Sequence, residues 1–151
     1  MTQTRTQTQA QTKTTPTMTA TLTWDSALEF TGQVGRHEVG LDGASYAAPS
    51  PMQVLALSLA GCMAIDLVHI LKKGRYTLSS LHAAFTGERA AEEPKRFTKI
   101  RLHFTLATDA PPDRIDRALQ LSRESCCSVW ASFRQDIELE TTYDIEVGSR
   151  R

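Results

Sequence analysis

Apolar and polar residues alternate along several short stretches of the chain, a period that is typical of β-strands with one buried face. The clearest stretch covers residues 97–108, where Ile100, Leu102, Phe104 and Leu106 alternate with polar residues. The same pattern predicts strands at residues 21–25, 28–31, 36–41, 76–87 and 137–147. Glycines between the first three predict a small antiparallel meander, and the polar connection around Pro94 predicts a hairpin.

Residues 52–71 form the longest apolar segment and predict a helix. Ser50 is a suitable N-cap and Pro51 suits the first turn, while Gly74 predicts the end of the helix. The polar residues within the segment argue against a membrane span: Gln53, Ser58, Asp66 and His69. Because the segment is apolar on nearly every side, we expect a central, buried helix.

A second helix is predicted from Pro111 to about Cys126, followed by a short helix over residues 128–134. The order of elements is therefore βββ–α–ββ–α–(α)–β. It lacks the regular β–α alternation of a doubly wound fold. We expect an α+β fold in which antiparallel sheets pack on two central helices.

Length and composition fit one folded domain. The chain has 151 residues, of which 40% are hydrophobic and 23% charged. Residues 1–20 are mostly Thr and Gln, so they bury too little apolar surface to order themselves, and we expect a disordered tail followed by the domain at 21–151. The formal net charge is zero, which disfavours nucleic-acid binding and a polybasic membrane-surface role.

The three cysteines are too few for a disulfide-stapled scaffold, and the N-terminus shows no secretory signal. We therefore expect a cytoplasmic protein with reduced thiols. Cys62, Asp66 and His69 share one face of the long helix, with Ser58 one turn earlier. Cys62 is either a small core residue or a reactive thiol. A metal site is disfavoured, because Cys62 and His69 lie roughly 10 Å apart along the axis.

A reactive Cys62 needs a cation from elsewhere in the fold, because the nearby Asp66 carboxylate disfavours a thiolate. The sequence offers three candidates for this cation: Arg36, His37 and Arg101. Cys126 and Cys127 follow the second helix. They are either two small residues at a helix junction, or one of them faces Cys62 across packed helices.

Several of these segments together resemble the OsmC/Ohr family, and specifically its OsmC-like branch. The resemblance lies in Ser50-Pro51-Met52, in Leu59-Ala60-Gly61-Cys62-Met63-Ala64-Ile65-Asp66, in Ile70-Leu71-Lys72-Lys73, and in Cys127-Ser128-Val129. It implies an α+β fold in which two chains intertwine into a homodimer with active sites at the interface. It also implies a peroxidase that reduces organic hydroperoxides with two cysteines and a dithiol reductant, without metal or organic cofactor.

The resemblance also implies roles for the cysteines. Cys62 matches the peroxidatic residue, which becomes a sulfenic acid, and Cys127 matches the resolving residue, which condenses with it to a disulfide. Cys126 lies where the family often has an aromatic residue, and we interpret it as a bystander. Arg36 is our choice for the arginine that activates the Cys62 thiolate.

One departure from the family pattern leaves the function open. Peroxidase members hold their arginine with a glutamate shortly after the Asn/Ser-Pro pair, where this chain has Met52 and Gln53. Glu29 or Glu38 could substitute for it in space. The alternative is a non-catalytic OsmC-like protein that binds a small apolar ligand at the dimer interface. A third reading is another thiol chemistry, such as thiol transfer or hydrolysis.

Overall fold

The computed structural model describes residues 14–147, so residues 1–13 of the expected tail lie outside the described part of the chain. The chain divides between Pro49 and Ser50 into two compact units. The N-terminal unit holds β1 (Thr21–Ser26), β2 (Glu29–Val34) and β3 (His37–Asp42). The C-terminal unit holds α1 (Pro51–Lys73), β4 (Leu78–Arg89), β5 (Phe97–Thr108), α2 (Pro112–Leu121), the π-helical turn η1 (Ser122–Cys126), α3 (Ser128–Ala131) and β6 (Glu138–Glu146).

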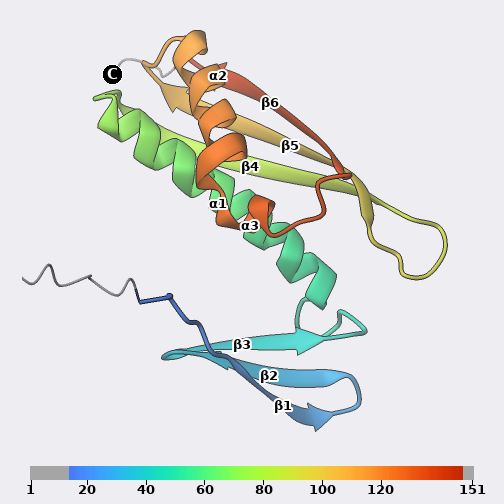
Figure 1. The fold of residues 1–151 in the computed structure, drawn as a ribbon. Coiled ribbons are helices and arrows are strands. Elements are labelled where there is room, and N and C mark those ends of the chain that lie inside the picture. Colours follow the sequence, from blue (N-terminus) through green and yellow to red (C-terminus); the bar gives the residue numbers. More distant parts are fainter. Residues whose placement is uncertain (1–13, 148–151) are drawn as a thin grey trace, which may run out of the picture. The chain divides into compact units, whose positions relative to one another are not determined.

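The N-terminal unit is the predicted antiparallel meander, with strand order β1-β2-β3 (Figure 1). Gly35 has a φ of +59° in the turn between β2 and β3, a conformation that glycine adopts without steric cost. At the end of β3, the buried Asp42 carboxylate accepts backbone hydrogen bonds from Ala44, Tyr46 and Ala47 at 2.9 to 3.0 Å. These bonds lower the pKa of Asp42 and fix the turn that follows the strand.

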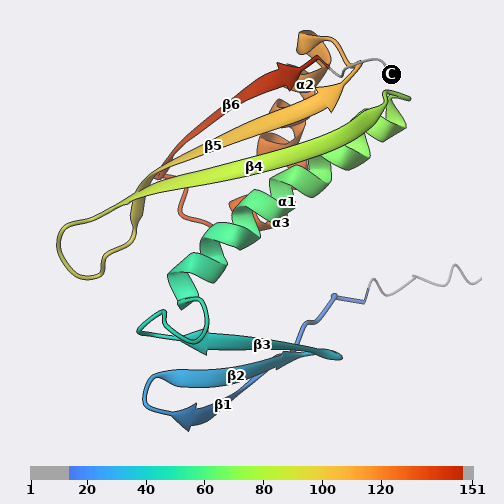
Figure 2. The same cartoon turned by 180° about the vertical axis from the view of Figure 1, so that it is seen from behind.

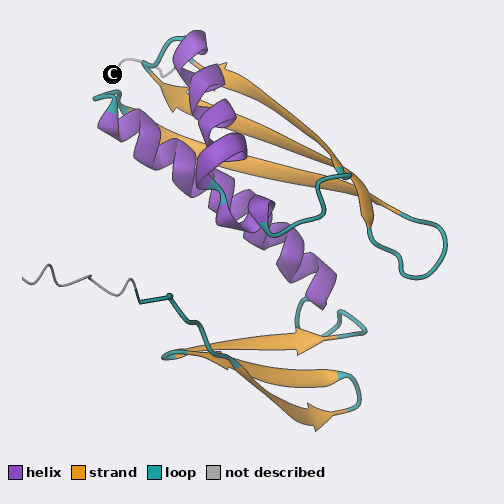
Figure 3. Cartoon of the chain, viewed as in Figure 1, coloured by secondary structure: helices purple, strands orange, loops and turns teal. Residues whose placement is uncertain are grey.

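In the C-terminal unit the three helices cover one face of the sheet β4-β5-β6, as the front and rear views show (Figures 1 and 2). The alternation that predicted β5 places Ile100, Leu102, Phe104 and Leu106 on the covered face, where all four are fully buried. β4 and β5 form the expected antiparallel hairpin. The α+β class is therefore confirmed (Figure 3).

β6 differs from the expectation of purely antiparallel sheets, because it pairs with β5 in parallel. Parallel neighbours need a long crossover, and the segment containing α2, η1 and α3 supplies it. The register places opposite charges side by side: Lys99 bonds Glu138, and Arg101 bonds Glu140, both at 3.1 Å. Cross-strand pairs of this kind favour one register over its neighbours.

Helix α1 forms where the sequence predicted it and carries the expected cap. Ser50 and Gln53 make a reciprocal capping box, and Lys72 and Lys73 occupy the last turn before Gly74. By length and composition alone the helix could cross a membrane, with a mean hydropathy of 2.1. One side of it packs into the core of the unit instead, through Leu59, Ala60, Met63, Leu67 and Leu71.

The expectation of a helix buried on all sides is wrong for the single chain. Leu57 is 68% exposed and Ile65 is 58% exposed on the other side of α1. The apolar residues of α1 therefore lie on two sides of the helix. The sheet and α2 cover one of these sides.

Candidate functional site: two facing thiols and a carboxylate

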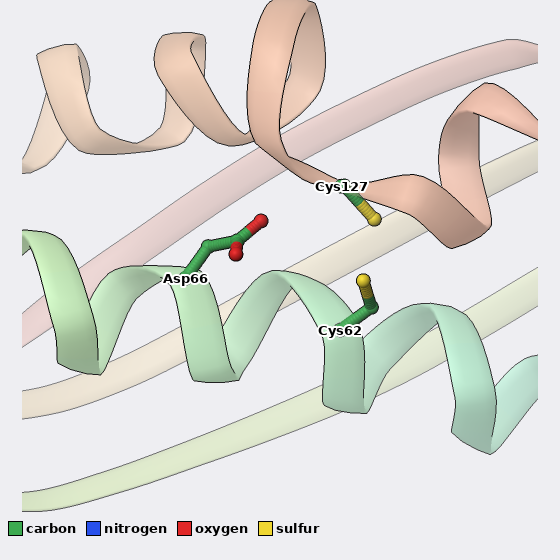
Figure 4. A group of neighbouring side chains, drawn as sticks. All are labelled: Cys62, Asp66 and Cys127. Carbon is green, nitrogen blue, oxygen red and sulfur yellow. The ribbon is translucent and has the colours of Figure 1, made fainter. Parts of the chain in front are cut away.

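The Sγ atoms of Cys62 and Cys127 lie across from each other, one on the middle of α1 and one where η1 meets α3. These two atoms and one carboxylate oxygen of Asp66 all lie within 4.8 Å of one another. Figure 4 shows both sulfurs pointing toward each other, with Asp66 one turn further along α1. All three cysteines are free thiols. The structure thus brings together Cys62 and Cys127, and it leaves the neighbouring Cys126 exposed.

The π-helical turn accounts for which of the two adjacent cysteines faces Cys62. The Cys127 N–H donates to the Ser122 carbonyl at 2.8 Å, which closes the wide turn Ser122–Cys126. Cys127 then caps α3, and its Sγ accepts the Trp130 N–H at 3.3 Å. The backbone therefore fixes the Cys127 side chain on the inner side of the junction.

The two facing cysteines have different surroundings. Cys127 is only 3% exposed, whereas Cys62 is half-buried. Burial raises the pKa of the Cys127 thiol to about 11, and the neighbouring Cys62 and Asp66 act in the same direction, against the hydrogen bond from Trp130. At neutral pH Cys127 is therefore a protonated thiol, and Cys62 is the sulfur that solutes reach more readily.

Asp66 is held in place by a residue that the sequence did not single out for chemistry. The fully buried Ser122 donates its hydroxyl to Asp66 Oδ2 at 2.7 Å. A sequence signal for this residue existed, because Ser122 continues the buried positions Ile115, Ala118 and Leu119 of α2. A hydroxyl at a core position requires a hydrogen-bond partner.

The rest of the expected polar stripe does not belong to this group. Ser58 is exposed and its hydroxyl donates to the Val54 carbonyl within its own helix at 2.8 Å. His69 is also exposed. In the described part of the chain, Cys62 and Asp66 are the two residues of this stripe that lie beside Cys127 and Ser122.

Of the three candidate cations, one belongs to the C-terminal unit and two belong to the N-terminal unit. Arg101 is on the outer face of β5, between the inward-facing Ile100 and Leu102, and pairs with Glu140. It therefore cannot activate Cys62, which lies on the covered side of the sheet. Arg36 lies in the exposed turn between β2 and β3, and His37 begins β3, so both belong to the N-terminal unit.

Met52 and Gln53, at the place of the family's acid, both have structural contacts. The Gln53 side chain accepts the Ser50 N–H at 2.9 Å in the capping box. Met52 lines a mostly apolar pocket of about 230 Å³ together with Leu55, Phe97, Phe133 and Ile137, and Arg96, Ser132 and Arg134 line it as well. Leu55 of the same helix belongs to this pocket as well, whereas Leu59 and Met63, the residues on either side of Cys62, are core residues.

The group Cys62, Asp66 and Cys127 also has the composition to be tested as a metal site. Structural zinc sites use four nitrogen or sulfur ligands, and this group offers two sulfurs and one carboxylate whose Oδ2 already accepts the Ser122 hydroxyl. The donor set does not fit a structural zinc centre. It fits a pair of thiols that can form a disulfide beside a carboxylate.

Comparison with known proteins identifies the family of this chain. Residues 42–142 match the family described as OsmC-like protein. The chain is 36% identical over 125 residues to Protein YhfA of Escherichia coli K12, a match that covers 81% of this chain and 93% of YhfA.

Solved structures show the same fold. A hypothetical protein from Aquifex aeolicus superposes with a TM-score of 0.81 at 23% identity, covering 87% of this chain and 98% of that one. The organic hydroperoxide resistance protein OsmC from Legionella pneumophila superposes with a TM-score of 0.66 at 16% identity, covering 87% and 99%. With the family match spanning most of the chain, this protein belongs to the OsmC-like family.

Proposed function

We propose that this protein is a thiol peroxidase that reduces organic hydroperoxides through Cys62 and Cys127. The observation that carries the proposal is the pair of free thiols facing each other from α1 and the η1–α3 junction, with Sγ atoms within 4.8 Å. A packing role requires neither two cysteines nor their alignment. The name of the Legionella relative, an organic hydroperoxide resistance protein, supports the choice of substrate class.

In the proposed first step, the Cys62 thiolate attacks one oxygen of the hydroperoxide. The O–O bond breaks, the alkoxide leaves and takes up a proton to become the alcohol, and Cys62 becomes a sulfenic acid. Cys62 has this role because it is the less buried of the two facing thiols and because Cys127 stays protonated. Cys127 then attacks the sulfenic sulfur, water leaves, and a disulfide forms.

A dithiol reductant completes the proposed cycle by ordinary thiol–disulfide exchange, which returns both cysteines to thiols. We place the reaction in the cytoplasm, where such reductants keep cysteines reduced. The chemistry calls on no metal or organic cofactor, since the thiols carry both electrons.

The proposed substrate preference can be measured directly. An alkyl hydroperoxide is expected to oxidise the reduced protein faster than hydrogen peroxide, because Cys62 lies on an apolar helix between the buried Leu59 and Met63. Competition kinetics with equal concentrations of tert-butyl hydroperoxide and hydrogen peroxide give the ratio of the two rate constants. An equal or reversed preference would remove the organic-hydroperoxide proposal.

We further propose that Arg36 of the N-terminal unit stabilises the Cys62 thiolate. Asp66 disfavours a thiolate within 4.8 Å of its carboxylate, so a compensating cation is needed. Arg36→Ala is expected to slow the first oxidation step by roughly 10-fold, because the attacking thiolate then lacks the positive charge that stabilises it. Arg101→Ala is the matched control, because Arg101 lies on the outer face of β5 and should react like the unaltered protein.

We also propose that the protein acts as a homodimer. Paired residues of the meander place Leu22, Trp24 and Val39 on one face of a small sheet, and Trp24 is 66% exposed in the single chain. Leu57 and Ile65 of α1 are exposed as well, and apolar faces of this kind are typical of surfaces that a second chain covers. Light scattering is expected to give twice the 16.7 kDa chain mass, and the mass of one chain at micromolar concentration would contradict the proposal.

One observation favours a second candidate function, the binding of a small apolar ligand without catalysis. Gln53 occupies the place of the family's acid and caps α1, so the arginine–glutamate arrangement of the peroxidases is not reproduced there. Under this alternative, one equivalent of alkyl hydroperoxide would leave the thiol count of the reduced protein unchanged within the time that a small thiol needs to react.

A further inference from the structure

The second step of the proposed cycle requires a buried, protonated thiol to act as a nucleophile. Cys127 must attack as a nucleophile, and the thiolate is the nucleophilic form of cysteine. Burial raises the pKa of Cys127 to about 11, so the thiol is almost entirely protonated at neutral pH. A group that removes this proton as the sulfur attacks would therefore accelerate the step.

Asp66 is an ionisable group that shares the site with both sulfurs. One of its carboxylate oxygens lies within 4.8 Å of the Sγ atoms of Cys62 and Cys127. This separation is within the reach of a bond through one water, and catalytic contacts commonly shorten once the reacting species is present. A negative charge beside Cys62 does not stabilise its thiolate, so Asp66 does not assist the first step electrostatically.

Ser122 links the orientation of Asp66 to the position of Cys127. Its hydroxyl donates to Asp66 Oδ2, and its carbonyl accepts the Cys127 N–H. The same fully buried residue thus holds the carboxylate through its side chain and the thiol through its backbone. The π-helical turn that begins at Ser122 produces this arrangement, and such turns are frequent at functional sites.

From this arrangement we infer that Asp66, oriented by Ser122, is the acid–base residue of the disulfide-forming step. This inference rests on the proposed peroxidase function. Asp66 accepts the proton of the Cys127 thiol as that sulfur attacks the Cys62 sulfenic acid. The S–O bond breaks, and Asp66 returns the proton to the departing hydroxide, which leaves as water. The Cys62 sulfur is reduced by the electron pair that Cys127 supplies, and the carboxylate is regenerated.

Asp66→Asn tests the inference, because the amide keeps the size of the side chain and can still accept the Ser122 hydroxyl but cannot take up the proton. The reduced full-length protein is mixed with one equivalent of tert-butyl hydroperoxide and quenched at successive times. Dimedone trapping measures the sulfenic acid, and alkylation followed by intact-mass measurement gives the disulfide. The sulfenic acid is expected to form at least as fast as in the unaltered protein, and the disulfide about 100-fold more slowly, as removal of a general base predicts.

Three further variants separate chemistry from structure. Asp66→Glu restores a carboxylate and is expected to recover at least part of the rate of disulfide formation. Ser122→Ala keeps the carboxylate but releases it, and an intermediate slowing is expected. Asp113→Asn, an exposed aspartate of α2, is the matched control and should not alter either step.

Each outcome decides between the two proposals. The inference is supported if the sulfenic acid accumulates in Asp66→Asn and has a shorter lifetime in Asp66→Glu than in Asp66→Asn. Disulfide formation at the unaltered rate in Asp66→Asn overturns the inference and leaves the peroxidase function intact. No sulfenic acid and no disulfide in the unaltered protein would overturn the proposed function, and the inference with it.

Discussion

Cys62→Ser protein is expected to consume no alkyl hydroperoxide above the rate of buffer alone. The proposed cycle begins with the Cys62 thiolate, and a serine hydroxyl is a far weaker nucleophile at neutral pH. Loss of an essential nucleophile commonly costs a factor on the order of 10³ or more in turnover. Because Cys62 is half-buried and serine has nearly the same size, the variant should keep the fold.

The measurement is peroxide consumption with dithiothreitol as the reductant. Cys126→Ser is the matched control, since Cys126 is exposed and should turn over almost normally. Residual turnover in Cys62→Ser that disappears only when Cys126 or Cys127 is also replaced would assign the first step to another thiol.

Cys127→Ser protein is expected to react once with the hydroperoxide and then stop in the absence of added thiol. The first step needs only Cys62, but without a facing thiol the sulfenic acid has no partner within the chain. Excess peroxide should then convert it to the sulfinic and sulfonic acids, which a dithiol does not reduce. Activity under repeated turnover is therefore expected to decline with each cycle.

Intact-mass spectrometry after stepwise additions of hydroperoxide follows this outcome, with dimedone present in a parallel sample to trap the sulfenic acid. Sustained turnover of Cys127→Ser without over-oxidation would show that Cys127 does not resolve the sulfenic acid.

The parts of the fold that follow from local patterns could be predicted from the sequence. Ser50, Pro51 and Gly74 define the ends of α1, and the structure places them at its N-cap, first position and C-cap. The alternation over Phe97–Thr108 gives β5 and its buried face. Turn residues such as Gly35 give the meander, because its strands pair with their neighbours in sequence.

Features that depend on contacts distant in sequence could not be predicted in the same way. The parallel pairing of β6 with β5 is set by the crossover through α2 and α3. An alternating pattern predicts a strand but does not indicate whether that strand pairs in parallel or antiparallel. The π-helical turn at Ser122–Cys126 has no periodic signature, although it fixes Cys127 toward α1. The exposure of one side of α1 could not be predicted from the pattern either. Leu57 and Ile65 lie on that side and are as apolar as the core residues.

The candidate site was predicted in part. The sequence identified Cys62 and, through the family resemblance, Cys127, and the structure shows them facing each other. It did not predict that Ser122 bonds Asp66, because the two residues are far apart in the chain. It also included Arg101 among the cations, and the alternation of β5 places that side chain on the opposite face of the sheet.

The position of the disulfide in the oxidised protein tests the redox pair most directly. Reduced full-length protein is treated with one equivalent of alkyl hydroperoxide, the remaining thiols are blocked, and the digested peptides are mapped by mass spectrometry. We predict a single bridge between Cys62 and Cys127, with Cys126 recovered as a blocked free thiol. A bridge from Cys126 to either of the other cysteines, or three free thiols after exposure to the hydroperoxide, would contradict the proposed pair.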